Sequence, residues 1–368
     1  MGPAKTFHHK TPSLNHGETG LLSEVETLLK KVEKASLPPD LKLNIEDSLH
    51  RLNRSIKAGS YQAEYERAAK YIEWLVALPW FNRSPDKLDL AEAKKILDKS
   101  HYGLSQIKDR ILEYLAVLKL QKEKASEEVV KLSRSPVICL VGLPGTGKTS
   151  FAQSIATTLG RKFARIPMGG MSNPLVLRGQ SRTFPEAEPG LIIKNIKKAG
   201  TKNPVLLLDE IDSTAEGVES DIMGVLLEIL DPEQNFAFAD YYIDYPFDLS
   251  EVLFICSANQ LGKISAAVAD RLEVILMPRY TDEDKIHIAR DYLFPRELEI
   301  VGLGEGIINF DPEVWPFVIK PFGYDVDIRT LQRTVNSILR KIARAYIEGK
   351  LKEVVINKTN LRDYLPSW

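Results

Sequence analysis

The chain has 368 residues, enough for two or three domains, and 44% of them are hydrophobic, enough to build a packed core. Its 49 lysines and arginines against 50 acidic residues give a net charge of −1, so overall charge gives no case for nucleic-acid binding. No Cys/His cluster has metal-ligand spacing, and no apolar run reaches the roughly 18 residues that span a bilayer. We therefore expect a cytoplasmic protein without a membrane partner, with Cys139 and Cys256 buried and reduced.

The N-terminal part of the chain predicts a tail followed by helices. Residues 1–20 are rich in His, Thr, Pro and Gly, and we expect a flexible tail there. From Leu21, apolar residues recur at helical spacing in three stretches, which predicts an N-terminal helical region over residues 21–84. Residues 81–90 break this periodicity as a linker, and Asp89 is placed to cap the next helix.

Residues 91–280 predict an α/β domain with a five-stranded parallel sheet. Short apolar runs, separated by helical patterns, are typical of strands buried on both faces. The five candidates are Val137–Val141, Lys162–Ile166, Val205–Leu208, Val252–Ser257 and Val274–Met277. From Thr281 the pattern is mostly amphipathic helix, with one weak strand at Val354–Ile356, which predicts a small helical domain over residues 281–366.

A phosphate-binding loop follows the first predicted strand directly, and a helical pattern follows the loop. This order of strand, loop and helix is the setting that the Walker A motif requires. Its glycines let backbone N–H groups close around phosphate oxygens, and the helix N-terminus adds unpaired donors. Lys148 would reach the β- and γ-phosphates of ATP, and the Thr149 hydroxyl would bind Mg²⁺. The predicted nucleotide-binding residues are Gly142, Leu143, Pro144, Gly145, Thr146, Gly147, Lys148, Thr149 and Ser150.

Two acidic residues end the third predicted strand, Val205-Leu206-Leu207-Leu208-Asp209-Glu210. Ligands of parallel sheets gather at the carboxyl ends of the strands. Asp209 can therefore hold Mg²⁺ together with Thr149, and Glu210 can deprotonate an attacking water. The tandem of Asp and Glu also argues against kinases and switch GTPases, which usually lack it.

Over roughly residues 21–366 the chain resembles the AAA+ ATPase module of Lon proteases, with part of their N-terminal helical region. Besides the phosphate loop, the resemblance rests on several short motifs. They include Tyr71-Ile72-Glu73-Trp74-Leu75, Leu78-Pro79-Trp80, His101-Tyr102-Gly103-Leu104, Asp209-Glu210-Ile211-Asp212, Leu230-Asp231-Pro232-Glu233-Gln234-Asn235 and Asp270-Arg271-Leu272. It implies an AAA+ P-loop NTPase fold in which the C-terminal helical domain is the lid.

The resemblance implies roles for residues that the sequence pattern alone leaves unassigned. Asn259 matches the sensor-1 position, which places the water and contacts the γ-phosphate. Arg271 matches the arginine finger, which enters a neighbouring subunit's ATP site, so a homo-hexameric ring is implied. Arg329 matches sensor 2 in the lid, and Tyr102 and Gly103 match a segment near the adenine.

The chain departs from the family in the segment from Arg178 to Gly190. In the family this segment carries a pore loop with an aromatic–aliphatic–Gly tip that grips substrate polypeptide. Here Phe184 keeps the aromatic residue, whereas Pro185 and Glu186 replace the other two. A proline stiffens such a tip. We expect a loop that grips a different substrate or grips poorly, and an acidic surface loop without a substrate role is the alternative.

The second departure concerns the family's proteolytic domain, with its Ser–Lys dyad, which should begin near Leu365. The sequence instead ends at Trp368 and contains no segment of the nucleophile type. We expect that this chain is not a peptidase by itself. It could be an ATPase-only relative, half of a split enzyme or a truncated form, and the sequence does not distinguish these.

Three functions follow from these observations. The leading hypothesis is a Mg-ATP-driven ring motor that remodels or threads polypeptides, with a separate peptidase as a further partner. The second is an ATP-regulated scaffold, against which the intact Glu210 and Arg271 argue. The third is a DNA-associated AAA+ protein, for which the only local sign is a basic cluster made of Lys194, Lys197, Lys198 and Lys202.

Overall fold

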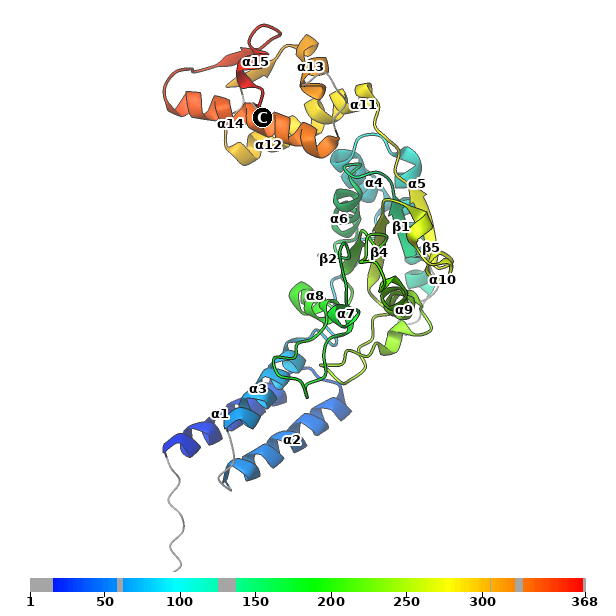
Figure 1. Cartoon of the computed structure of the whole chain (residues 1–368), viewed down its shortest axis with the longest axis vertical. Helices are drawn as coiled ribbons and strands as arrows, with labels where there is room; N and C mark the ends of the chain where they lie inside the picture. Colours follow the sequence, from blue (N-terminus) through cyan, green and yellow to red (C-terminus); the bar gives the residue numbers. More distant parts are fainter. Residues whose placement is uncertain (1–15, 58–61, 125–136, 305, 322–326, 367–368) are drawn as a thin grey trace, which may run out of the picture.

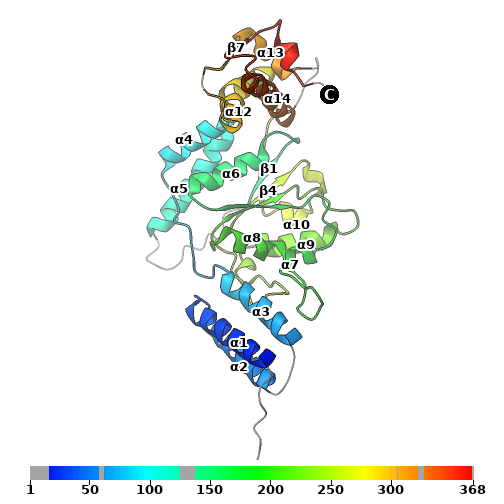
Figure 2. The same cartoon turned by 90° about the vertical axis from the view of Figure 1, so that its left-hand side faces the viewer.

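The computed structural model describes residues 16–57, 62–124, 137–304, 306–321 and 327–366 (Figures 1 and 2). The molecule is elongated, with helices at its N-terminal end, a sheet with its covering helices in the middle, and a second helical unit at the C-terminal end. Of the helices within these ranges, none combines the length and apolar character that crossing a membrane requires.

Three helices form the N-terminal end: α1 (His16–Lys34), α2 (Pro39–Lys57) and α3 (Gln62–Ala77). Apolar residues of α1 and α2 face each other and are buried, including Val25 and Leu49. Helix α2 begins at Pro39, since proline is tolerated in the first helical turn. Helix α1 begins at His16, so the prediction of a tail was wrong for residues 16–20. Residues 1–15 of the predicted tail lie outside the described ranges.

The predicted linker at residues 81–90 is held against the sheet. Arg83 donates to Glu251 with two bonds of 2.5 and 2.7 Å, and the Ser84 amide donates to Asn203 over 2.8 Å. The predicted cap at Asp89 is confirmed, because its carboxylate accepts from the first amides of α4 (Leu90–Ser100). Helix α5 (Ser105–Lys124) follows.

A parallel sheet forms the centre, as predicted, with strand order β2-β3-β4-β1-β5. Its bounds differ from the predicted ones by at most two residues. The strands are β1 (Val137–Val141), β2 (Phe163–Pro167), β3 (Val205–Asp209), β4 (Leu253–Ala258) and β5 (Leu272–Leu276). Cys139 and Cys256 are register partners on β1 and β4, and both are free and buried, as expected.

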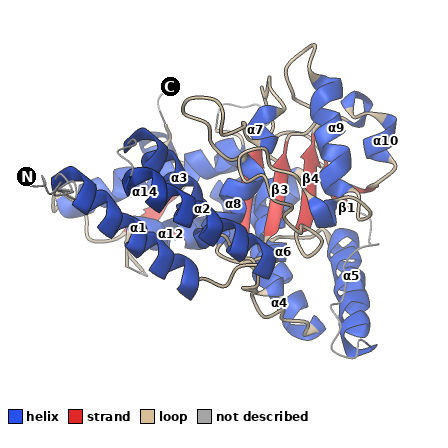
Figure 3. Ribbon diagram, turned by 90° about the horizontal axis from the view of Figure 1, so that it is seen from below, coloured by secondary structure: helices blue, strands red, loops and turns tan. Residues whose placement is uncertain are grey.

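Helices cover both faces of this sheet, which explains the continuous apolar runs (Figure 3). Ile138 and Leu140 pack with α4, α5 and α6 (Lys148–Leu159), whereas Cys139 and Val141 belong to the core on the opposite face. That second core includes the helices α8 (Leu191–Ala199) and α9 (Glu219–Leu230). The shorter elements are α7 (Leu175–Arg178), η1 (Asn235–Ala237), η2 (Leu261–Lys263) and α10 (Ala266–Ala269).

The C-terminal unit has a buried core of its own, to which Trp315, Leu331 and Ile338 belong. Its elements are α11 (Asp282–His287), η3 (Ile288–Leu293), α12 (Phe294–Val301), β6 (Ile308–Phe310), η4 (Pro312–Val314), α13 (Trp315–Ile319), α14 (Ile328–Ile347), β7 (Val354–Ile356) and α15 (Leu361–Tyr364). The predicted strand β7 is confirmed. It pairs in parallel with β6, which the sequence did not predict, because three residues are too few to show strand periodicity.

Candidate nucleotide site

The phosphate loop connects β1 to α6 and depends on its glycines. A Cβ atom at Gly142 would lie 2.8 Å from the carbonyl oxygen of Met277, so no side chain fits there. Gly145 and Gly147 have φ values of +80° and +91°, a conformation that favours glycine. The loop can therefore bring its backbone close to a phosphate group.

Lys148 is buried at the centre of this loop. Its Nζ donates to the carbonyl oxygens of Gly142 and Leu143, over 2.5 and 3.0 Å, and to Oδ1 of Asn259 over 3.0 Å. Burial lowers the pKa of Lys148, and the carboxylates of Asp209, Asp212 and Glu210 act in the opposite direction. Asn259 follows β4, the strand between β3 and β1, so sheet order brings these two predicted residues together.

Asp209 ends β3 and is buried beside the loop. Thr149 Oγ1 donates to Asp209 Oδ2 over 3.2 Å, and the hydroxyl of Ser257 donates to Oδ1. Within the described ranges, no group of three or more His, Cys, Asp or Glu side chains could hold a metal. A hydroxyl and one carboxylate suit Mg²⁺, which is usually held by one or two protein oxygens together with substrate phosphates and water. The pair of Thr149 and Asp209 therefore fits this cation.

Glu210 has an unusual backbone for its residue type. Its φ is +61°, in the left-handed region, and its amide donates to Ser257 Oγ over 2.9 Å. A Cβ atom built on Gly169 would lie 3.0 Å from Glu210 Oε2, so the glycine leaves room for the carboxylate. Strain of this kind concentrates at functional sites, where surrounding contacts hold it in place.

Three further residues at this site had no role in the sequence-based prediction. Ser257 joins Asp209 to the Glu210 amide, and Arg165 donates to Asp209 Oδ2 over 2.5 Å. Asp212 Oδ2 accepts from the amides of Asn259 and Gln260, 3.0 Å each. Asp212 lies in a motif of the family resemblance, which was the only signal for it, whereas the contacts of Ser257 and Arg165 arise from strand pairing.

Tyr102 and Gly103 lie between α4 and α5, where the central unit meets the C-terminal one. The Tyr102 ring stacks on His287 of α11, with centroids 4.9 Å apart and planes 7° apart. The neighbouring His101 has Nε2 at 3.0 Å from Ser150 Oγ, next to the phosphate loop. Burial lowers the pKa of His101 to about 4, so this imidazole is neutral at physiological pH.

The start of α14 lies against the phosphate loop. A Cβ atom at Gly145 would be 2.9 Å from the Cβ of Asp327, whose carboxylate caps α14. Tyr280 also donates to the Thr146 carbonyl over 3.3 Å. Arg329 is exposed in the first turn of α14, close enough for its charge to act on Lys148. The C-terminal unit thus covers the loop with a helix end and presents Arg329 beside it.

Arg271 is not brought to this site. It precedes β5, at the amino end of the sheet, whereas the other site residues follow the carboxyl ends of β1, β3 and β4. Its guanidinium donates to Asp231 Oδ2 over 2.8 Å and to the Ala267 carbonyl over 2.9 Å. The hydrogen bond from Arg271 is the largest cause of the lowered pKa of Asp231.

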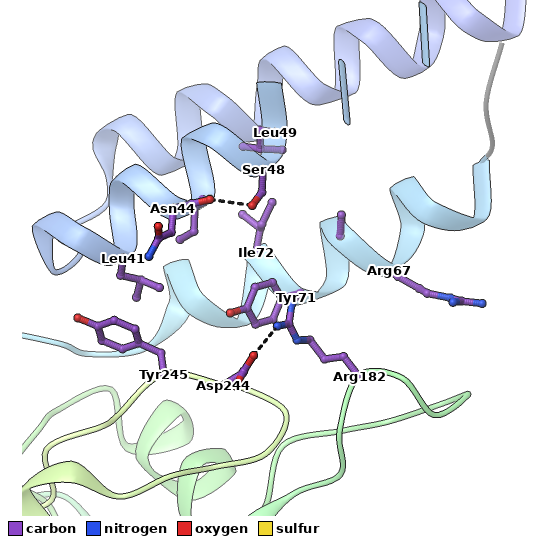
Figure 4. A pocket seen from close by; sticks show the side chains of 12 residues that line it. Leu41, Asn44, Ser48, Leu49, Arg67, Tyr71, Ile72, Arg182, Asp244 and Tyr245 are labelled. Atoms are coloured by element: carbon purple, nitrogen blue, oxygen red, sulfur yellow. Dashed lines mark hydrogen bonds and ion pairs between the residues drawn. The ribbon is translucent and has the colours of Figure 1, made fainter. Parts of the chain in front are cut away.

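Phe184 and Pro185 lie on a loop that contacts the N-terminal helices rather than the phosphate loop. Phe184 lies at the tip of this loop and is 64% exposed. Beside it, Arg182 stacks on Tyr71 of α3, 3.8 Å from the ring centroid, and donates to Asp244 over 3.0 Å (Figure 4). Arg182, Tyr71 and Asp244 line a cavity of about 420 Å³ beside α2 and α3.

The basic cluster on and after α8 is largely neutralised. Lys194 pairs with Glu188 over 2.7 Å, and Lys202 pairs with Asp248 and Glu251 over 2.9 and 3.2 Å. The ammonium group of Lys197 lies 3.7 Å over the ring of Trp74. The cluster therefore does not present an open patch of free charge, which weakens the argument for DNA binding.

A parallel sheet with a Walker loop after β1, an acidic pair at the end of β3 and a helical unit over the loop define an AAA-type P-loop fold. Residues 138–280 match the family model described as ATPase family associated with various cellular activities (AAA). The chain is, in addition, a homologue of the Lon proteases over nearly its whole length.

Three curated relatives show the extent of this similarity. Lon protease 1 of Bacillus subtilis is 43% identical over 349 residues, 95% of this chain and 43% of the relative. Lon protease 2 of Thermus thermophilus is 42% identical over 353 residues, with the same two coverages. Lon protease of Desulfovibrio desulfuricans is 44% identical over 327 residues, 89% of this chain and 36% of the relative. The chain thus spans less than half the length of these relatives.

Proposed function

We propose that this chain hydrolyses Mg-ATP as an AAA+ ATPase and uses the energy to move or remodel polypeptides. The observation that supports this most directly is the convergence of three chain segments at one sheet edge. Lys148 and Thr149 from the loop after β1 contact Asn259 after β4 and Asp209 at the end of β3. A phosphate-binding loop alone would serve binding, whereas the added carboxylates and amide serve hydrolysis.

In this proposal each group has one task. Backbone N–H groups between Gly145 and Ser150 and the ammonium group of Lys148 bind the phosphates, and Asn259 orients the γ-phosphate and the attacking water. Thr149 and Asp209 hold Mg²⁺, which neutralises charge on the phosphates when bound. Glu210 takes the proton from the water as its oxygen attacks the γ-phosphorus, and ADP leaves.

The adenine end of the nucleotide belongs in the proposal to the junction of the two units. Tyr102 and Gly103 stand at this junction, and the C-terminal helices, residues 281–366, act as a lid with a core of its own. Arg329 reaches from the lid toward the phosphates. Such a lid changes its position when the nucleotide changes, which transmits hydrolysis to the rest of the molecule.

The position of Arg271 supports a ring-shaped assembly of several copies of the chain. Arg271 lies at the opposite end of the sheet from its own phosphate loop, where a second copy in head-to-tail contact would receive it. We propose a homo-hexamer in which Arg271 completes the neighbouring site. Polypeptide would pass along Phe184 and Pro185, and a peptidase, separate or on a longer chain, would receive it.

Substitution of Glu210 tests the hydrolytic role. Glu210→Gln keeps the shape of the side chain but removes the base, so ATP turnover should fall by about 10²–10³-fold while ATP binding persists. Lys148→Ala should lose binding as well. The measurement is steady-state phosphate release together with equilibrium binding of a fluorescent ATP analogue.

The matched control is Glu216→Gln, an exposed glutamate on the same loop. It should turn over ATP like the parent. If Glu210→Gln also hydrolysed ATP at the parent's rate, Glu210 would not be the base. If the parent itself bound nucleotide without turnover, the chain would be the ATP-regulated scaffold.

A further inference from the structure

Asp209, the carboxylate proposed to hold Mg²⁺, already carries a positive partner. Its side chain is almost fully buried, and its Oδ1 accepts from Ser257. Its Oδ2 accepts from Arg165 Nε over 2.5 Å and from Thr149 Oγ1 over 3.2 Å. Arg165 therefore contacts the same oxygen of Asp209 as Thr149, the other residue proposed to hold Mg²⁺.

The position of Arg165 in the sheet explains this contact. It lies on β2, the edge strand beside β3, and pairs in register with Leu207, two residues before Asp209. Residues two apart on a strand share a face, so Arg165 and Asp209 lie on the same face of the sheet. The Arg165 side chain is 48% exposed, whereas that of Asp209 is 4% exposed. The arginine can consequently turn into solvent, but the aspartate cannot.

The guanidinium of Arg165 and the proposed Mg²⁺ are both positive and compete for the carboxylate of Asp209. A buried carboxylate without a counter-charge is costly, and the guanidinium removes that cost. A divalent cation at the same oxygen would repel the guanidinium from a distance of a few ångströms. The two positive groups cannot both hold this oxygen at close range.

We propose that Arg165 is the resident counter-charge of Asp209 and that Mg²⁺ binding displaces it. Arg165 is then a positioning residue that pairs with Asp209 and keeps its carboxylate oriented before the metal arrives. It also raises the Mg²⁺ concentration that the site needs. This inference rests on the proposed role of Asp209 in holding Mg²⁺.

The test measures metal binding rather than turnover. A fluorescent ADP analogue is titrated into the parent, Arg165→Gln and Arg165→Lys, first in EDTA and then at rising Mg²⁺. Loss of a half-exposed pair should lower the half-saturating Mg²⁺ concentration of Arg165→Gln by about three- to tenfold. Nucleotide affinity in EDTA should change little. Arg165→Lys, which keeps the charge, should behave like the parent.

Arg110→Gln is the matched control, since Arg110 pairs with Glu273 on the surface of the same unit, 3.3 Å away. It should titrate like the parent. An equal or higher Mg²⁺ requirement in Arg165→Gln would overturn the inference, as would a lowered requirement in Arg165→Lys. A parent that binds nucleotide equally well with and without Mg²⁺ would overturn both this inference and the metal site. A parent that binds no nucleotide would instead refute the proposed function.

Discussion

Ser257 connects the two acidic residues on which the proposed chemistry depends. Its side chain is completely buried in β4. The hydroxyl donates to Asp209 and accepts from the amide of Glu210, so a single oxygen fixes the proposed metal ligand and the strained backbone of the proposed base. Strand β4 thus determines the geometry of residues that end β3.

Replacing Ser257 by alanine should therefore affect both stability and turnover. The buried carboxylate of Asp209 and the half-buried amide of Glu210 each lose a partner, at about 1–3 kcal/mol of unfolding free energy. Glu210 also loses the bond that holds its left-handed conformation, so ATP turnover should fall by roughly tenfold while nucleotide binding changes little. Denaturant unfolding and steady-state phosphate release measure the two effects.

Thr158→Ala provides the control for this variant. Thr158 is also a buried hydroxyl, but it donates to the Ser154 carbonyl within α6, which keeps its helical partner. Its loss should cost less stability and leave turnover at the parent's level. Parental turnover in Ser257→Ala would contradict the positioning role.

At the scale of elements, the loop that carries Phe184 is anchored by helix α3. Arg182 stacks on Tyr71, and the Tyr71 hydroxyl donates to the Ile243 carbonyl over 2.9 Å. The base of the loop is closed where the Gly190 amide donates to the buried Asp240 over 2.7 Å. The N-terminal helices therefore hold the flank of the loop while its tip stays exposed.

Tyr71→Leu should loosen this loop without changing its sequence. A cation–π contact of about 0.5–1 kcal/mol would be lost, which corresponds to roughly two- to fivefold faster amide exchange over residues 179–190. Hydrogen–deuterium exchange with peptide resolution measures the change. Tyr65→Leu on the same helix is the control, because Tyr65 bonds Glu24 of α1 instead. Equal exchange in both variants would mean that α3 does not anchor the loop.

The sequence predicted the elements better than the contacts between them. The five sheet strands were predictable because each is a short, mostly apolar run, whereas β6 is too short for a pattern. Lys148, Thr149 and Asp209 could be predicted because fixed spacing and a strand end define them. Arg165 and Ser257 could not, because a polar residue inside a strand gains its role only from the neighbouring strand, and strand order is not visible in the pattern.

At the scale of the molecule, the proposed nucleotide site lies at the junction with the lid, and the loop with Phe184 lies against the N-terminal helices (Figure 1). The two regions are linked through the sheet, since α8 follows this loop and packs on β2, the edge strand that carries Arg165. Helix α8 therefore connects the strand that carries Arg165 to the loop that carries Phe184 by a route that does not include the lid.

The site is proposed to be shared between copies, and mixing two inactive variants tests this. Lys148→Ala should be inactive because it does not bind the phosphates of ATP, and Arg271→Ala should lose about 10³–10⁵-fold in turnover because its neighbour's site lacks the finger.

In mixed rings, a Lys148→Ala subunit still donates Arg271 to an Arg271→Ala neighbour with an intact phosphate loop. In an equal mixture roughly a quarter of the sites are complete, so measurable phosphate release should return. A mixture of Arg271→Ala with the double variant should stay inactive, because subunits with an intact loop are then present but no partner supplies the arginine. If light scattering showed mixed assemblies but turnover did not return, Arg271 would act within its own chain, and its bond to Asp231 would be purely structural.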